Sequence, residues 1–234
     1  MTGGTGTLGM EIQQIVSCIA PKRDELDVTS FDSCQNVIKK YNPDIIIHAA
    51  AYTDVVGAET NKANCWNVNV AGTEHMIRAA HGARFVFIST DYVFDGEKGN
   101  YAEDDIPNPT HFYALTKLIG EVIVRQYPRT LIIRTAFKPN GPWKYHAAFT
   151  DQFTSHEFVS VIAPQIVKVA LMPDPEGIIH IAGKRKSIYE FAKRASPDVK
   201  KMSKSDVDVL LPHDTSLNCS KWKAILSKSN LAKK

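Results

Sequence analysis

Three short, continuous apolar runs most constrain how this chain can fold. They are "DIIIHAAA" (Asp44–Ala51), "RFVFIST" (Arg84–Thr90) and "TLIIRT" (Thr130–Thr135). Strands without polar alternation are typical of parallel sheets, which are covered on both faces. The segments Cys65–Ala80 and Thr110–Gln126 are typical of helices, and we expect the first residue of the second one to be its N-cap. The alternation predicts an α/β protein with a Rossmann-like doubly wound parallel sheet.

The alternation becomes less regular after Thr135. We expect a helix at Val159–Leu171, started or kinked by Pro164, then a strand at Gly177–Gly183 and a helix at Ser187–Arg194. We interpret residues 1–137 as a dinucleotide-binding domain and residues 138–234 as a small substrate-binding lobe. We expect the boundary to be soft, with interleaved contacts.

A glycine-rich loop opens the chain. The stretch "TGGTGTLG" places glycines at Gly3, Gly6 and Gly9, and a helix is expected to begin at Thr7–Leu8. Such a loop lets the backbone approach a pyrophosphate, and the helix N-terminus offers N–H groups and a positive dipole end. At the start of a βαβ chain this spacing indicates a dinucleotide site rather than an ordinary turn.

The strand that should precede this loop is missing from the sequence pattern. Only Met1 and Thr2 come before the glycines. The sequence leaves two alternatives: the chain begins after that strand, or another segment fills its place in the sheet. The stretch Gly9–Asp27 is also short for a helix plus a strand, and Cys18–Ala20 is the candidate second strand.

The residues after that candidate strand bear on the choice of cofactor. Arg23 follows it, and a basic side chain there suits the extra phosphate of NADP, whereas an acidic one suits NAD. We therefore predict NADP, with NAD as the alternative. Asp27 and Val28 end the segment, where we expect contacts with adenine.

The candidate catalytic residues are Thr90, Tyr113 and Lys117. In the helix predicted over "YALTK", Tyr113 and Lys117 share one face. A lysine ammonium beside a phenol, together with the positive charge of a nicotinamide, lowers the pKa of the phenol, so Tyr113 is expected to act as a general acid toward a carbonyl oxygen. Thr90, at the carboxyl end of the preceding strand, is placed to hydrogen-bond the same oxygen. A Tyr–Lys pair alone is common, but the strand end and the glycine loop make the set more specific.

The sequence resembles the extended short-chain dehydrogenase/reductases, and within them the dTDP-4-dehydrorhamnose reductases that reduce nucleotide-linked 4-keto-6-deoxy sugars. The matching motifs are "TGGTGTLG", "LDVT", "PDIIIHAAAYTDV", "NVNVAGT", "ISTDYVFDG", "YALTK" and "LIIRT". They cover almost all of residues 2–137. After residue 137, "DQF" and "IAPQIV" also fit the sequence pattern of the family.

The resemblance implies a role for each matching position. The implied catalytic residues are Thr90, Tyr113 and Lys117, and the last two also touch the nicotinamide ribose. Asp91 would hold the sugar with Phe137, where the family often has Trp. Asn69 would brace the sheet. The implied cofactor contacts are Gly6, Thr7 and Leu8 at the pyrophosphate, Asp27 and Val28 at the adenine, and Ala50, Ala51 and Tyr52 alongside.

Three other kinds of protein are close to this resemblance. Nucleotide-sugar 4,6-dehydratases carry Asp-Glu after the threonine, but here the pair is Asp91-Tyr92. Epimerase-reductases of the GDP-fucose synthase kind carry a Cys where this chain has Tyr92. Simple reduction is therefore favoured over both. The third alternative, a non-catalytic regulator resembling the methionine adenosyltransferase beta subunit, stays open because such subunits can keep the catalytic-looking set.

Composition and charge argue against several other classes of protein. The net charge of +3 argues against a dedicated nucleic-acid binder, and no apolar run is long enough to span a membrane. The cysteines lack metal-ligand spacing, so no metal site is predicted and a cytoplasmic location is expected. The basic clusters Lys184–Lys186 and Lys233–Lys234 are expected to be solvated surface. The sequence leaves the oligomeric state open, a homodimer included. The cysteines are Cys18, Cys34, Cys65 and Cys219.

Overall fold

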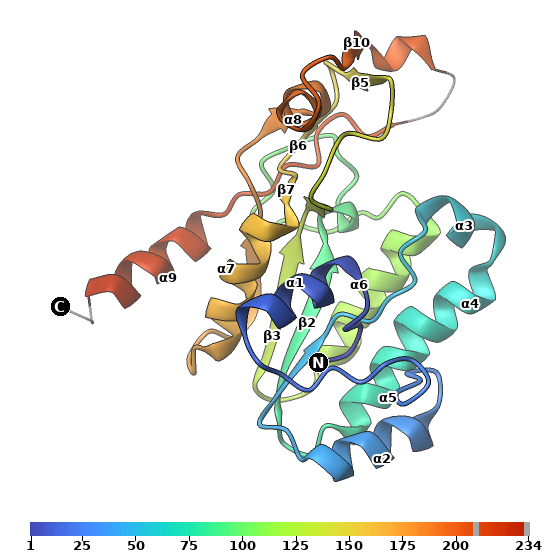
Figure 1. Ribbon diagram of the computed structural model, residues 1–234, viewed down its shortest axis with the longest axis vertical. Coiled ribbons are helices and arrows are strands. Elements are labelled where there is room, and N and C mark those ends of the chain that lie inside the picture. Colours follow the sequence, from blue (N-terminus) through green and yellow to red (C-terminus); the bar gives the residue numbers. More distant parts are fainter. Residues whose placement is uncertain (208–210, 232–234) are drawn as a thin grey trace.

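The fold is described from a computed structural model that covers residues 1–207 and 211–231 (Figure 1). The Lys233–Lys234 cluster lies outside the described residues. The helices are α1 (Thr7–Ile15), α2 (Phe31–Tyr41), α3 (Val55–Thr60), α4 (Lys62–Trp66), α5 (Gly72–Ala79), α6 (Phe112–Val124), α7 (Val159–Leu171), α8 (Ile188–Ala195) and α9 (Ser220–Leu231). The strands are β1 (Ile45–His48), β2 (Arg84–Thr90), β3 (Thr130–Thr135), β4 (Phe137–Lys138), β5 (Ala147–Phe149), β6 (Phe153–Thr154), β7 (Glu157–Phe158), β8 (Gly177–Ile181), β9 (Lys186–Ser187) and β10 (Lys200–Met202).

The main sheet is parallel and has the strand order β1-β2-β3-β8. Every residue of β2 and β3 is buried, which is why both read as unbroken apolar runs. The predicted α/β class with a parallel sheet is confirmed. β8 pairs with β3, so a segment after residue 137 returns to the main sheet, while the domain boundary itself stays a prediction.

Helices cover both faces of this sheet (Figure 1). On one face, α1 and α7 bury apolar side chains such as Ile12 and Ile166 against β2, β3 and β8. On the other face, α2 and α5 pack residues such as Val37 and Met76 against β1 and β2, and Val124 of α6 joins them. Among the described helices, none is long and apolar enough to span a bilayer.

The beginning of the chain differs from expectation. Thr2 forms an isolated parallel bridge with His48 of β1, and its N–H donates to the Ile47 carbonyl at 3.0 Å. Cys18–Ala20 is not a strand, so that prediction was wrong. A strand needs a neighbour for its ladder of hydrogen bonds. Among the described residues, the backbone of Cys18–Ala20 takes part in one hydrogen bond, from the amino group of Met1 to the Ile19 carbonyl, and Cys18 and Ile19 are exposed.

Three helical segments differ in detail from the predictions. The segment Cys65–Ala80 is helical but contains a π-helical stretch at Asn67–Ala71 between α4 and α5. α6 begins at Phe112, so Thr110 lies too early to cap it; instead the His111 side chain accepts from the Ala114 N–H at 3.2 Å. Pro164 lies inside α7 and does not start it.

Candidate functional site

A cavity of about 560 Å³ lies at the carboxyl ends of β1, β2 and β3 and at the N-terminus of α1. Ligands of open α/β sheets bind in this position. All the site residues predicted from the sequence line it. They are Gly3, Gly6, Thr7, Leu8, Arg23, Asp27, Val28, Ala50, Ala51, Tyr52, Thr90, Asp91, Tyr113, Lys117 and Phe137. Their individual roles stay predictions.

The glycine loop is packed so closely that side chains would not fit. Gly3 has φ +70°, and a Cβ there would lie 2.7 Å from the Ala50 nitrogen. A Cβ on Gly9 would lie 2.2 Å from the Gly3 carbonyl oxygen. α1 begins directly after Gly6, which has no side chain to cap it. The loop and the helix N-terminus therefore form a cradle that fits a dinucleotide pyrophosphate.

The predicted adenosine contacts line the same cavity as the glycine loop. The Asp27 carboxylate accepts from the Thr29 N–H at 3.0 Å and from its hydroxyl at 2.8 Å. These bonds, helped by the nearby Arg23 guanidinium, hold the pKa of Asp27 below its usual value. Arg23 is exposed and lines the cavity, so its guanidinium is accessible to an anionic group.

A buried amide fixes the loop after β1. The Asn69 side chain accepts from the Tyr52 N–H at 2.8 Å and donates to the Tyr52 carbonyl at 3.1 Å. It also donates to the Thr116 hydroxyl of α6 at 2.9 Å. Asn69 therefore has a structural role, as expected, but it braces the loop and α6 rather than the sheet.

The three predicted catalytic side chains all line this cavity. Tyr113 and Lys117 lie one turn apart on α6, and Thr90 ends β2. All three are buried, and the Lys117 ammonium lies 4.1 Å from the centre of the Phe87 ring. Burial lowers the pKa of Lys117 to about 8, against opposing effects of Glu121 and Cys65.

The pKa of the Tyr113 phenol is shifted in the opposite direction from the one we expected. Burial, with Asp91, Tyr92 and Cys65 acting in the same direction, raises the pKa of Tyr113, whereas Thr90 lowers it. The expectation of a lowered pKa is thus not met by the protein groups alone, because desolvation by burial is the largest effect on the phenol. A phenol that keeps its proton is still suited to act as an acid.

Asp91 and Phe137, the predicted substrate contacts, line the same cavity. The Asp91 carboxylate accepts from the Thr215 hydroxyl at 2.8 Å and from the Thr90 hydroxyl at 3.2 Å. Burial raises the pKa of Asp91 to about 6, although Thr215 and Lys138 oppose the rise. Phe137 is half-buried in β4, which pairs with β7.

The polar cavity residues that the sequence did not point to include Thr135, Lys138 and His156. Thr135 could have been found, because it ends β3 as Thr90 ends β2. Lys138 lies in β4, shortly after Thr135 in the chain. No sequence signal pointed to His156, which lies in the loop between β6 and β7.

The parallel sheet, the glycine cradle and the cavity at the strand ends define a Rossmann-like α/β protein. The chain belongs to the RmlD substrate binding domain family, whose model matches residues 1–165.

Relatives of two kinds are similar to this chain. A dTDP-4-dehydrorhamnose reductase of Aggregatibacter actinomycetemcomitans is 36% identical over 147 residues, which are 58% of this chain and 50% of the relative. The methionine adenosyltransferase 2 subunit beta of Bos taurus is 38% identical over 138 residues, 53% of this chain and 41% of the relative. The match thus spans about half the length, or less, of these curated relatives.

A solved structure extends the similarity over most of the chain. The dTDP-4-dehydrorhamnose reductase of Bacillus anthracis, in complex with NADP, superposes with a TM-score of 0.86 at 26% identity. The alignment covers 95% of this chain and 89% of that one. The family and the fold are therefore shown by sequence and by structure together.

Proposed function

We propose that this protein uses NADPH to reduce the keto group of a nucleotide-linked 4-keto-6-deoxy sugar. One observation carries the proposal: Thr90, Tyr113 and Lys117 line the same cavity as the glycine cradle. The similarity to dTDP-4-dehydrorhamnose reductases, one of them in complex with NADP, supports both the substrate class and the cofactor.

Each residue has a defined task in this reaction. The cradle of Gly3, Gly6 and α1 binds the pyrophosphate, and Arg23 binds the additional phosphate that separates NADPH from NADH. NADPH, when bound, supplies the hydride for the carbonyl carbon. Tyr113 donates its proton to the carbonyl oxygen, so ketone, hydride and proton together give the alcohol.

The neighbours of Tyr113 hold that proton and the oxygen in place. The Thr90 hydroxyl turns from Asp91 to donate its hydrogen bond to the carbonyl oxygen of the bound substrate, and so orients that oxygen toward the phenol. The Lys117 ammonium stabilises the phenolate left after proton transfer and binds the ribose. Because the pKa of Tyr113 is raised, the phenol is protonated at neutral pH, as an acid must be.

A second candidate function is supported by similarity to the beta subunit of methionine adenosyltransferase. In that case the cavity binds a dinucleotide and the chain regulates a partner enzyme. An assay that mixes the purified protein with NADPH and a dTDP-linked 4-keto-6-deoxyhexose distinguishes the reductase from the regulator. Consumption of NADPH with formation of the 4-hydroxy sugar supports the reductase. Cofactor binding without turnover, together with binding to a methionine adenosyltransferase catalytic subunit, supports the regulator.

A further inference from the structure

The Asp91 carboxylate is held by two threonine hydroxyls. Asp91 is 2% exposed and lines the cavity. One of its oxygens accepts from the Thr215 hydroxyl at 2.8 Å, and the other accepts from the Thr90 hydroxyl at 3.2 Å. A hydroxyl has one proton to donate, so each threonine uses its proton on this carboxylate. Thr90 is among the described residues that line the cavity and can turn to a ligand, whereas Thr215 is not.

Thr215 comes from a distant part of the chain. It lies 124 residues after Asp91, within residues 213–219, which run between β10 and α9. The family model matches residues 1–165, so this segment lies outside the match. Thr215 can therefore act on a ligand through the carboxylate that it holds, and no motif in the matched part of the chain points to it.

Residues 213–219 are fixed to the segment around β6. The Thr215 N–H donates to the Phe153 carbonyl of β6 at 3.1 Å. Two residues later, the Leu217 N–H donates to the Ser155 hydroxyl, also at 3.1 Å. Thr215 is itself only 4% exposed. Its side chain is thus presented to Asp91 by a backbone that is held at residue 215 and again at residue 217.

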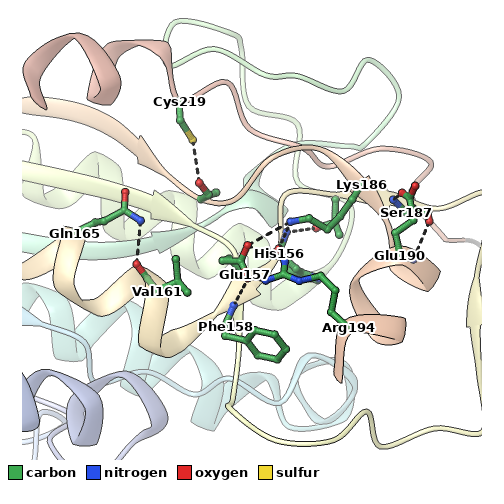
Figure 2. A network of polar contacts seen from close by, with 12 residues as sticks. His156, Glu157, Phe158, Val161, Gln165, Lys186, Ser187, Glu190, Arg194 and Cys219 are labelled. Carbon is green, nitrogen blue, oxygen red and sulfur yellow. Dashed lines mark hydrogen bonds and ion pairs between the residues drawn. The ribbon is translucent and has the colours of Figure 1, made fainter. Parts of the chain in front are cut away.

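The loop after Ser155 is held in turn by β9 (Figure 2). The Lys186 ammonium of β9 donates to the His156 carbonyl at 2.8 Å and pairs with the Glu157 carboxylate at 3.7 Å. At the end of residues 213–219, the Cys219 thiol donates to the Ala182 carbonyl at 3.7 Å (Figure 2). The position of Thr215 is therefore set by the packing of the C-terminal part of the chain.

The hydrogen bond from Thr215 also affects the charge of Asp91. Burial raises the pKa of this carboxyl to about 6, and Thr215 is the largest of the effects that oppose the rise. Loss of the Thr215 hydroxyl should therefore raise this pKa further. Among the described residues, the ionisable groups that interact with the Asp91 charge include Tyr92, Tyr113 and Lys138.

We propose that Thr215 is a positioning residue: it fixes one oxygen of the Asp91 carboxylate, so that the other oxygen accepts a hydrogen bond from the bound sugar nucleotide once Thr90 has turned to the ligand carbonyl. The inference rests on the proposed function, because it takes the ligand to be a keto sugar bound at Thr90. It extends the site to a segment that lies outside the family match.

The test removes the hydroxyl of Thr215 and keeps its shape. Binding of a dTDP-linked 4-keto-6-deoxyhexose is measured by calorimetry with NADP present, alongside kcat/KM. We expect Thr215→Val to weaken this binding, and to lower kcat/KM, by about 10-fold, because a bond to a charged acceptor is lost, while the Kd for NADP changes by less than about twofold. Thr215→Ser, which keeps the hydroxyl, should stay within about twofold of the wild type.

Thr130→Val is the matched control. The buried Thr130 hydroxyl donates to the Val124 carbonyl at 3.0 Å, at the start of β3, and Thr130 is not among the described residues that line the cavity. This variant also loses a buried hydroxyl, so its stability should fall, but its affinity for the sugar nucleotide should not change. Equal losses of affinity in Thr130→Val and Thr215→Val would overturn the inference.

Two further measurements separate positioning from a purely structural role. Binding through the ionised carboxylate weakens as the pH falls and Asp91 takes up a proton. In Thr215→Val this loss should begin at a higher pH than in the wild type, whereas a structural role would leave that pH unchanged. In an Asp91→Ala background, Thr215→Val should weaken binding by less than about twofold, because the carboxylate it acts through is gone.

The inference and the reductase proposal fail separately. Weaker binding in Thr215→Val, with Thr130→Val unaffected, supports the inference even without turnover, which would overturn only the reductase. Wild-type affinity in Thr215→Val overturns the inference and leaves a protein that turns over as a reductase. If Thr215→Val does not fold, Thr215→Cys, whose thiol is a weak donor, takes its place, and wild-type affinity there overturns the inference too. If the ligand does not bind the wild-type protein, both are overturned.

Discussion

Arg134 donates two hydrogen bonds to the Glu121 carboxylate, at 2.9 and 2.8 Å, and neither side chain is exposed. The Ser89 hydroxyl donates to the same carboxylate at 2.6 Å. These residues directly precede Thr135 and Thr90 in β3 and β2, while Glu121 lies one turn after Lys117 on α6. The buried pair therefore ties the helix with the predicted acid to the strand ends it must face.

Breaking this pair should be costly. Arg134→Met removes the buried cation of the Glu121 carboxylate and leaves only the half-exposed Arg125 guanidinium, 3.6 Å away, so we expect the free energy of unfolding to fall by about 3–5 kcal/mol. Adding Glu121→Met removes the stranded charge, so the double variant should be more stable than Arg134→Met alone. Urea unfolding measures both. Strictly additive losses would contradict the coupling.

The buried Lys117 predicts a pH dependence of stability. Burial lowers its pKa from 10.5 to about 8, so between these values the unfolded chain binds more protons than the folded one. The free energy of unfolding should therefore gain up to about 3 kcal/mol from this group as the pH rises through that window, and lose it as the pH falls to 8.

The matched variant for this prediction is Lys117→Met, which cannot titrate. Urea unfolding of both proteins at several pH values from 8 to 10.5 should show the wild type gaining stability relative to the variant. Parallel curves across this range would exclude a buried lysine that titrates there.

Arg23 should set the preference between the two cofactors. A direct ion pair with the extra phosphate of NADPH is worth about 1–3 kcal/mol, so Arg23→Ala should weaken NADPH binding by about 5- to 150-fold. NADH binding should change little. Lys22→Ala, at an exposed neighbour outside the cavity lining, is the control, and fluorescence titration gives the affinities. Equal affinity of the wild type for both cofactors, unchanged in Arg23→Ala, would remove the argument for NADPH.

The sequence correctly predicted the strands in which an unbroken run of apolar residues reflects burial on both faces. β2 and β3 have the expected bounds because they are buried on both faces. It failed at Cys18–Ala20, because a strand depends on a neighbour that local pattern does not reveal. The N-cap of α6 was assigned one residue early, at Thr110 instead of His111, since both can accept a hydrogen bond.

The same limit applies to the site. Thr90, Tyr113 and the glycine loop follow from local motifs and strand ends. His156 does not, since it reaches the cavity only through the pairing of β7 with β4 and the contacts of Glu157. The raised pKa of Tyr113 was also missed, because desolvation depends on the whole packing around the phenol.

The most direct test of the reductase proposal is the turnover of Tyr113→Phe with NADPH and a dTDP-4-keto-6-deoxyhexose. The change removes the proton donor and keeps the ring, so kcat should fall by about 100-fold or more while the Kd for NADPH changes little. Tyr145→Phe, at a position that is 69% exposed, should behave as the wild type. A Tyr113→Phe protein that turns over as fast as the wild type would contradict the account.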